Sequence, residues 1–202
     1  MRLVFATGNA GKLREAREIL APAGVEVLSP ADAGLSPEDV EVEETGTTFR
    51  ENSLIKAKHL YSLCGLPCFA DDSGLAVDAL NGEPGIYSAR YASLDGGEDH
   101  NFGSNIAKLL HKMKGVSDRT ARFVCAVTLI INGEPHFFDG TCEGHIAEEP
   151  SGNGGFGYDP VFVADAFPGM TLAEVPEDDK NAVSHRGKAL QSMSIFLDLH
   201  NN

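Results

Sequence analysis

Apolar positions along the chain recur with two periods, one typical of strands and one typical of helices. Short apolar or alternating runs predict strands over residues 3–6, 25–28, 66–70, 75–80 and 122–131. Apolar positions three and four residues apart predict helices over residues 12–20, 48–64, 105–113 and 188–200. The two kinds of element alternate early, and Asn132 and Gly133 predict an antiparallel hairpin late in the chain. The pattern therefore indicates an α/β fold with a mixed sheet.

The apolar run over residues 66–70 is followed at once by two carboxylates, Asp71 and Asp72. We expect the strand to end at these acids. In open α/β sheets ligands bind outside the carboxyl ends of strands, and carboxylates there suit Mg²⁺. A turn or a helix cap is the alternative. However, two adjacent acids repel each other unless a cation or hydrogen-bond donors lie between them.

The length of the chain fits a single domain over residues 1–202, with room for a small second lobe. Hydrophobic residues make up 42% of the chain, which is enough for a core. The formal net charge of −14 argues against nucleic acid as a partner, because general binding to it needs a basic surface. No apolar run reaches the ~18 residues of a membrane span, and the four cysteines lack zinc-site spacing. We therefore expect a cytoplasmic protein.

A loop of small residues, ATGNAGK, separates the first predicted strand from the first predicted helix at positions 6–12. Backbone N–H groups at a helix N-terminus can bind a phosphate, and Lys12 adds a positive charge. The loop differs from a Walker P-loop at Ala6, where a glycine is required, and at Leu13, where Ser or Thr is required. It is a phosphate-loop candidate of another kind, with an ordinary strand–helix turn as the alternative.

The second predicted helix begins near Thr48, and two acids, Glu43 and Glu44, precede it. Acids in this position stabilise a helix dipole, so alone they give little indication of function. Asn52 and Lys56 are four residues apart and share a helix face that differs from the apolar face.

The glycine-rich stretch at residues 152–160 combines backbone that can approach a ligand with two aromatic rings, Phe156 and Tyr158. A nucleotide base could stack on such rings, and Asp159 could accept hydrogen bonds from its edge. Further donors precede the last predicted helix at Lys180, His185 and Arg186. The alternatives are a core edge for the rings and a solvated surface for the cations.

Together, these stretches supply a phosphate loop, acids for a metal and an aromatic group for a base, which are the parts of a nucleoside triphosphate site. The chain resembles the non-canonical purine nucleoside triphosphate pyrophosphatases, also called inosine/xanthosine triphosphatases. The motifs that carry the resemblance are TGNAGK at 7–12, EETGTTFREN at 43–52, ADDSGLAVDALNGEPGIYSARY at 70–91, GGFGYDP at 154–160 and SHRGKAL at 184–190. They occur in the family's order over nearly the whole chain.

The resemblance implies an elongated α/β fold, in which a long mixed sheet and flanking helices form two lobes around a nucleotide cleft. It also implies a homodimer and a requirement for Mg²⁺. The reaction would be hydrolysis of ITP, dITP or XTP between the α and β phosphates, giving the monophosphate and pyrophosphate. The cellular role would be to cleanse the nucleotide pool of deaminated purines.

The resemblance also assigns roles to single residues. Asp72 would be the catalytic base, with Asp71 supporting it. Glu44 and Asp72 would hold Mg²⁺, with Glu43 as the alternative to Glu44. The triphosphate would be bound by Thr7, Gly8, Asn9, Ala10, Gly11, Lys12 and Lys56. The rest of the substrate would be bound by Ser73, Phe156, Gly157, Tyr158, Asp159, Lys180, His185 and Arg186.

Three other functions stay open on the sequence. A related pyrophosphatase could prefer modified pyrimidine or methylated nucleotides, although the SHRG stretch favours purines. A sensor could bind the triphosphate without cleaving it, although the acids then have no purpose. A metal phosphatase acting on small esters would leave the GGFGYDP stretch unexplained.

Overall fold

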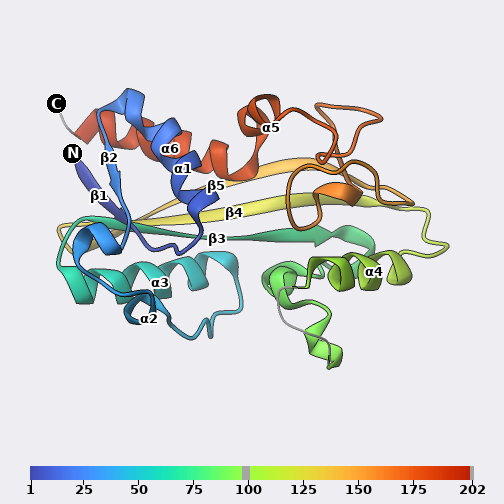
Figure 1. The fold of residues 1–202 in the computed structure, drawn as a ribbon, viewed down its shortest axis with the longest axis horizontal. Coiled ribbons are helices and arrows are strands. Elements are labelled where there is room, and N and C mark those ends of the chain that lie inside the picture. The colour runs from blue at the N-terminus through green and yellow to red at the C-terminus, as the bar shows by residue number, and fades with distance from the viewer. Residues whose placement is uncertain (97–100, 201–202) are drawn as a thin grey trace. The chain divides into compact units, whose positions relative to one another are not determined.

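A computed structural model describes residues 1–96 and 101–200 of the chain (Figure 1). It divides into two compact units. The first unit consists of Met1–Asp72, Cys125–Gly140 and His185–Asn202. The second unit consists of Ser73–Val124 and Thr141–Ser184. Within the described residues, every helix is too short or too polar to span a lipid bilayer.

The chain forms a six-stranded mixed sheet with flanking helices, so the predicted mixed α/β fold is confirmed. The strands are β1 (Arg2–Phe5), β2 (Glu26–Leu28), β3 (Cys68–Val77), β4 (Thr120–Ile131), β5 (Glu134–Ile146) and β6 (Phe162–Ala164). Their order in the sheet is β2-β1-β3-β4-β5-β6. Strand β1 is parallel to β2 and β3, whereas β5 is antiparallel to β6. The longer helices are α1 (Ala10–Leu20), α3 (Phe49–Cys64), α4 (Phe102–Lys112) and α6 (His185–His200). The shorter ones are α2 (Pro37–Val40) and α5 (Glu177–Val183).

Local sequence explains several of these boundaries. The Thr48 side chain accepts a hydrogen bond from the backbone of Glu51 and begins α3, as its position in the sequence predicts. Asn132 and Gly133 connect β4 to β5 with φ angles of 53° and 82°, which suits the tight hairpin turn predicted there. The short helix α2 was not predicted, although Ser36 and Pro37 are typical of a helix start.

The prediction that a strand ends at Asp71 and Asp72 is wrong. Strand β3 continues through both acids to Val77 and so joins the two predicted strands over residues 66–70 and 75–80, although Asp78–Leu80 form a short 3-10 helix instead of strand. The apolar pattern breaks at the acids because their partners come from distant helices, which a local pattern cannot reveal.

In the first unit, α1 and α6 cover one face of the sheet and α3 covers the other (Figure 1). The alternation of side chains along β3 follows these two layers. Phe69 packs in the core formed with α1 and α6, whereas Cys68 and Ala70 pack in the core formed with α3. The same alternation directs Asp71 to the first layer and Asp72 to the second.

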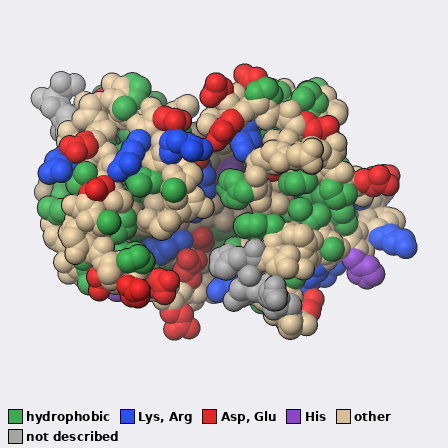
Figure 2. Space-filling view, in the orientation of Figure 1, with side chains coloured by type: hydrophobic (Ala, Val, Ile, Leu, Met, Phe, Trp, Pro, Cys, Tyr) green, Lys and Arg blue, Asp and Glu red, His purple; other side chains and the backbone are tan. Residues whose placement is uncertain are grey.

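In the second unit, one core gathers side chains from α4 and from the halves of β3, β4 and β5 that belong to this unit. Tyr158 lies in this core and donates a hydrogen bond to the backbone oxygen of Ser88 at 2.9 Å. On the face shown in Figure 2, acidic, basic and hydrophobic side chains are interspersed.

Helix α6 begins at His185, three residues before the predicted start. Its first turn packs directly on Gly140 of β5. A Cβ added at Gly140 would lie 2.1 Å from the backbone oxygen of His185 and 2.7 Å from the backbone nitrogen of Ala189. The glycine therefore permits a contact between helix and strand backbones that a larger residue would prevent.

Candidate active site

The predicted phosphate loop connects β1 to α1, as expected. Asn9 is the N-cap of α1, and its Oδ1 accepts hydrogen bonds from the backbone N–H groups of Gly11 and Lys12 at 2.9 and 3.1 Å. Thr7 Oγ1 accepts a hydrogen bond from the backbone of Asn9 at 3.1 Å. Three of the amides that could bind phosphate are thus already bonded within the loop, while Gly8 to Gly11 are exposed to solvent.

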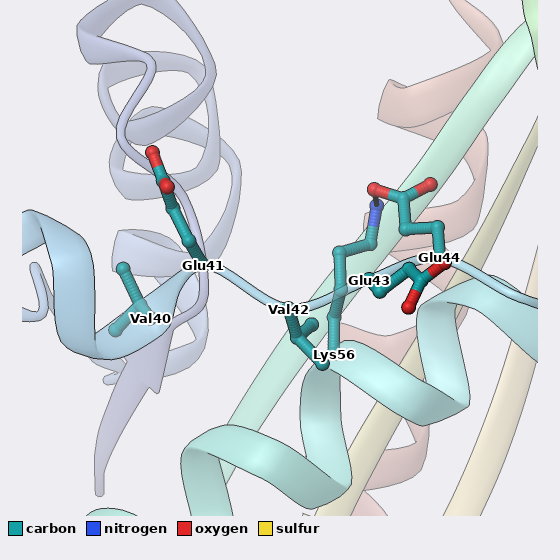
Figure 3. Close-up of a pocket in the computed structure, with 6 residues that line it drawn as sticks. All are labelled: Val40, Glu41, Val42, Glu43, Glu44 and Lys56. Atoms are coloured by element: carbon teal, nitrogen blue, oxygen red, sulfur yellow. Dashed lines mark hydrogen bonds and ion pairs between the residues drawn. The ribbon is translucent and has the colours of Figure 1, made fainter.

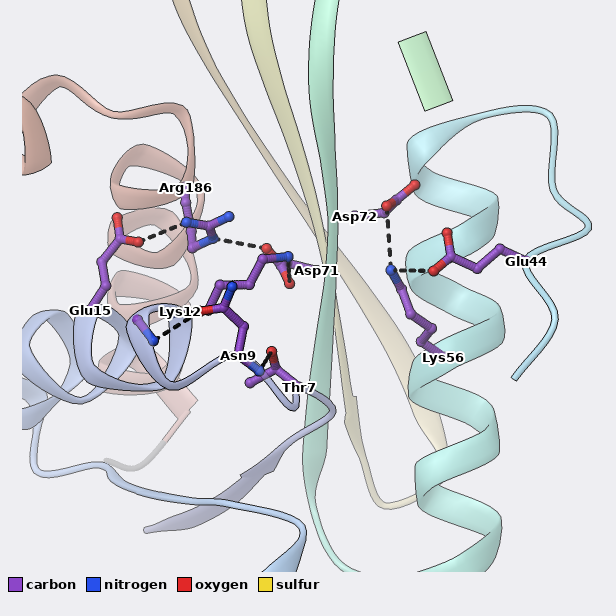
Figure 4. Close-up of polar contacts among 10 residues, drawn as sticks. Thr7, Asn9, Lys12, Glu15, Glu44, Lys56, Asp71, Asp72 and Arg186 are labelled. Carbon is purple, nitrogen blue, oxygen red and sulfur yellow. Dashed lines mark hydrogen bonds and ion pairs between the residues drawn. The ribbon is translucent and has the colours of Figure 1, made fainter. Parts of the chain in front are cut away.

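Asp71 and Asp72 lie beyond the end of β1. The last residue of β1, Phe5, pairs with Phe69, so the following part of β3 lies where β1 has turned into its loop. Ligands commonly bind at such a carboxyl end of parallel strands. Figure 4 shows the two acids on opposite sides of β3, Asp71 toward α1 and α6 and Asp72 toward α3.

Asp71 is part of a buried chain of charges. Its carboxylate accepts hydrogen bonds from Lys12 Nζ at 3.0 Å and from Arg186 Nε at 2.8 Å. Arg186 also donates to Glu15 at 2.8 Å. Burial alone would raise the pKa of the Asp71 carboxyl, but the charges of Lys12 and Arg186 outweigh burial and hold that pKa well below its usual range. Asp71 is therefore ionised and structurally paired.

Asp72 belongs to a separate cluster on the other face. Its carboxylate accepts hydrogen bonds from Asn52 Nδ2 at 3.2 Å and from Lys56 Nζ at 3.3 Å. Glu44 accepts from the same ammonium at 3.1 Å. Burial raises the pKa of Asp72, and Glu44 adds to this, although Lys56 opposes it. A carboxylate with a raised pKa is a stronger proton acceptor than one in water.

A pocket of about 490 Å³ lies beside this cluster and is lined by Val40, Glu41, Val42, Glu43, Glu44 and Lys56 (Figure 3). Glu44 points to the Lys56 ammonium, whereas Glu43 is exposed. Within residues 1–96 and 101–200, no group of three or more His, Cys, Asp or Glu side chains is arranged to hold a metal ion. The Glu44 and Asp72 carboxylates nevertheless lie on the same cation, the Lys56 ammonium. Two carboxylates in this position suit Mg²⁺, with water molecules as its further ligands.

The predicted base-binding residues of the second unit form another cluster. Phe156 is 55% exposed, and Lys180 Nζ lies 5.9 Å from the centre of its ring. Asp159 is buried and accepts hydrogen bonds from the backbone of Phe156 at 3.0 Å and from Lys180 at 3.2 Å. Tyr158 is 3% exposed, so Phe156 alone of the two rings presents a surface for stacking.

The remaining predicted residues take other positions. Ser73 follows Asp72 in β3, and Gly157 has a φ of 62° between the exposed and the buried ring. His185 and Arg186 lie in the first turn of α6 rather than ahead of the helix, and Arg186 is only 4% exposed. No local pattern in the sequence indicates Glu15 as a partner of Arg186.

Known proteins match this chain over nearly its whole length. The model of the Ham1 family matches residues 3–196. A Treponema denticola protein named dITP/XTP pyrophosphatase is 50% identical over 199 residues, which is 98% of each chain. A protein of the same name from Escherichia coli K12 is 46% identical, covering 100% of this chain and 98% of that one.

Two solved structures also resemble this chain in fold over nearly its full length. The Staphylococcus aureus Ham1 protein has a TM-score of 0.87 at 38% identity, covering 99% of this chain and 100% of that one. A Mycobacterium abscessus protein described as nucleoside-triphosphatase / dITP/XTP pyrophosphatase has a TM-score of 0.77 at 42% identity. It covers 96% of this chain and 98% of that one.

Proposed function

The chain belongs to the Ham1 family, and from this premise we propose that it hydrolyses ITP, dITP and XTP to the monophosphate and pyrophosphate. Relatives that match the full length and are named for dITP and XTP support the substrate class. The observation that carries the chemistry is the meeting of the Glu44 and Asp72 carboxylates at the Lys56 ammonium, with separations of 3.1 and 3.3 Å.

We propose Mg²⁺ as the metal and Glu44 and Asp72 as its protein ligands. Both side chains supply oxygen donors, which Mg²⁺ prefers. When bound, the ion would neutralise negative charge on the phosphate oxygens. Glu44 is favoured over Glu43 because it already lies against a cation beside Asp72.

The residues of the first unit would position the triphosphate and activate water. Asp72 would accept a proton from a water molecule while the oxygen of that water forms a bond to the α-phosphorus. The bond from that phosphorus to the bridging oxygen would break, and pyrophosphate would leave with the electron pair. Lys56 and Lys12 would balance the negative charge on the phosphates, so the catalysis rests on positioning and electrostatics.

The residues of the second unit would bind the base. Phe156 offers an exposed ring for stacking, and Lys180 is a donor beside it. Hypoxanthine and xanthine carry a 6-oxo acceptor, whereas adenine carries an amine that would leave such a donor unpaired. A site that requires a hydrogen bond to its substrate can discriminate against an analogue that cannot form this bond by ~10⁴-fold or more. His185 is a further candidate donor to the base. Arg186 could donate to the base only after breaking its hydrogen bonds to Asp71 and Glu15.

The family resemblance further suggests that both units act as one functional domain and that the protein is a homodimer. A substrate drawn from the nucleotide pool also suggests a cytoplasmic location. Light scattering coupled to size exclusion would test the dimer.

The direct test is release of pyrophosphate from ITP, dITP, XTP, ATP, GTP and a modified pyrimidine triphosphate, each with Mg²⁺ and with EDTA. We expect release from the three non-canonical purines and loss of release in EDTA. Binding without release would instead indicate a sensor. Release of orthophosphate would place the attack on a different phosphorus, and preference for the pyrimidine would indicate the related pyrophosphatase class.

A further inference from the structure

The side chain of Asn52 joins two parts of the candidate site. Asn52 lies in the first turn of α3 and is fully buried. Its Nδ2 donates a hydrogen bond to Asp72 Oδ2 at 3.2 Å, and its Oδ1 accepts one from the backbone N–H of Gly46 at 2.9 Å. Gly46 lies two residues after Glu44. One amide therefore connects β3 to the segment that carries Glu44.

The two partners of Asn52 require an amide at this position. The N–H of Gly46 can only donate, and an ionised Asp72 carboxylate can only accept. A side chain that serves both must therefore present a donor and an acceptor side by side. A carboxylate would keep the bond to Gly46 and lose the bond to Asp72, and an alanine would lose both.

The surroundings hold this amide in place. A Cβ added at Gly46 would lie 2.6 Å from Asn52 Oδ1 and 2.7 Å from Glu51 Cβ, so the segment packs closely on α3. The next residue, Ser53, shares a hydrogen bond of 2.7 Å with Thr128 of β4, and both side chains are buried. The helix turn that carries Asn52 is thus fixed to the sheet.

We propose that Asn52 is a positioning residue that sets Glu44 against Asp72 and so assembles the carboxylate pair for the metal. The inference rests on the proposed function and adds to it a residue that acts through Asp72 and Gly46 without touching the nucleotide. Removal of a group that orients a metal ligand typically lowers metal affinity or activity about 10–100-fold.

The test uses Asn52→Ala, which removes both hydrogen bonds, and the near-isosteric Asn52→Asp, which keeps only the one from Gly46. We expect Asn52→Ala to lower kcat for ITP about 10–100-fold at saturating Mg²⁺ and to leave KM for ITP unchanged. Binding of Mn²⁺ to the nucleotide-free protein, followed by EPR, should weaken to a similar extent. Exchange of the Gly46 amide proton, followed by NMR, should accelerate in Asn52→Ala and stay as in the wild type in Asn52→Asp.

Asn105→Ala is the matched control. Asn105 is 1% exposed, and its amide also bonds on both sides, to the backbones of Ala92, Ser88 and Ala89. This variant should lower the Tm without changing Mn²⁺ binding. If Asn52→Ala also lowers only the Tm and keeps kcat and Mn²⁺ binding, the proposal is wrong. If the wild type releases no pyrophosphate, the proposed function fails, while Mn²⁺ binding and Gly46 exchange still decide the role of Asn52.

Discussion

Asp71 and Asp72 are consecutive residues whose carboxylates bind different cations on opposite faces of β3. Asp71 binds Lys12 and Arg186, and Asp72 binds Lys56. This arrangement places two acids side by side in the chain without leaving either one unpaired. It also separates their tasks, because Asp71 ties helices to the sheet while Asp72 lies with the candidate metal and proton-transfer groups.

Asp72→Asn should abolish most turnover and leave the fold intact. The amide keeps the shape of the side chain but accepts protons poorly and carries no charge for a metal. Loss of a general base typically costs about 10²–10⁴-fold in rate. Pyrophosphate release and thermal unfolding would be measured together. Asp139→Asn, in a surface pair with Arg50, is the control and should keep full activity. Retained activity in Asp72→Asn would overturn the assignment.

Asp71→Asn should destabilise the protein. The variant leaves Lys12 and Arg186 without their shared anion, and breaking a buried ion pair typically costs about 3–5 kcal/mol. Urea unfolding at neutral pH would measure the loss. Glu26→Gln removes the exposed pair with Arg2 and should cost at most ~1 kcal/mol. Equal losses in the two variants would contradict the buried-pair explanation.

The Asp71 pair also predicts how stability depends on pH. The folded pKa of Asp71 lies below its value of ~3.9 in an unfolded chain. The unfolded state therefore takes up the proton first as the pH falls. The contribution of Asp71 should be complete above about pH 4 and decline steadily below it. Urea unfolding between neutral and acid pH should show a weaker acid dependence in Asp71→Asn than in the wild type.

Phe156→Ala should weaken substrate use with little effect on stability. The ring is 55% exposed, so its removal leaves no large cavity, whereas stacking on a base is worth about 1–3 kcal/mol. We expect kcat/KM for ITP to fall by the corresponding factor. Phe137→Ala is the control, because Phe137 is 37% exposed and lies under Arg50 in the first unit. A similar loss in both variants would argue against a stacking role.

Gly140→Ala should lower stability by about 1–3 kcal/mol or more, because the new methyl group would meet backbone atoms of α6 that cannot move alone. His185 begins that helix, so activity should fall as well. Thermal unfolding of Gly103→Ala provides the comparison. That glycine is within α4, and among the described residues a Cβ there meets only Asn101 Oδ1 at 3.5 Å, so alanine should be tolerated or stabilising.

The sequence predicts those structural elements that depend on residues close together in the chain. The loop between β1 and α1, the cap at Thr48 and the hairpin at Asn132 all follow from neighbouring residues. The shared face of Asn52 and Lys56 also follows from helical spacing, and both side chains do reach Asp72.

Long-range partners account for what could not be predicted. Strand β3 passes through Asp71 because Lys12 and Arg186 neutralise it from 59 and 115 residues away. The burial of Arg186 likewise depends on Glu15, which is 171 residues distant. Two aromatic residues in the stretch at 156–158 look alike in sequence, yet only Tyr158 enters the core, because the chain reverses at Gly157 with a positive φ.

The alternation along β3 has an evolutionary consequence. Inserting or deleting a single residue between Phe69 and Asp71 would move every following side chain to the opposite layer. The two carboxylates would then exchange places, and each would face the partners of the other. Lineages that carry this protein should therefore keep a constant residue count in β3 even where its side chains diverge.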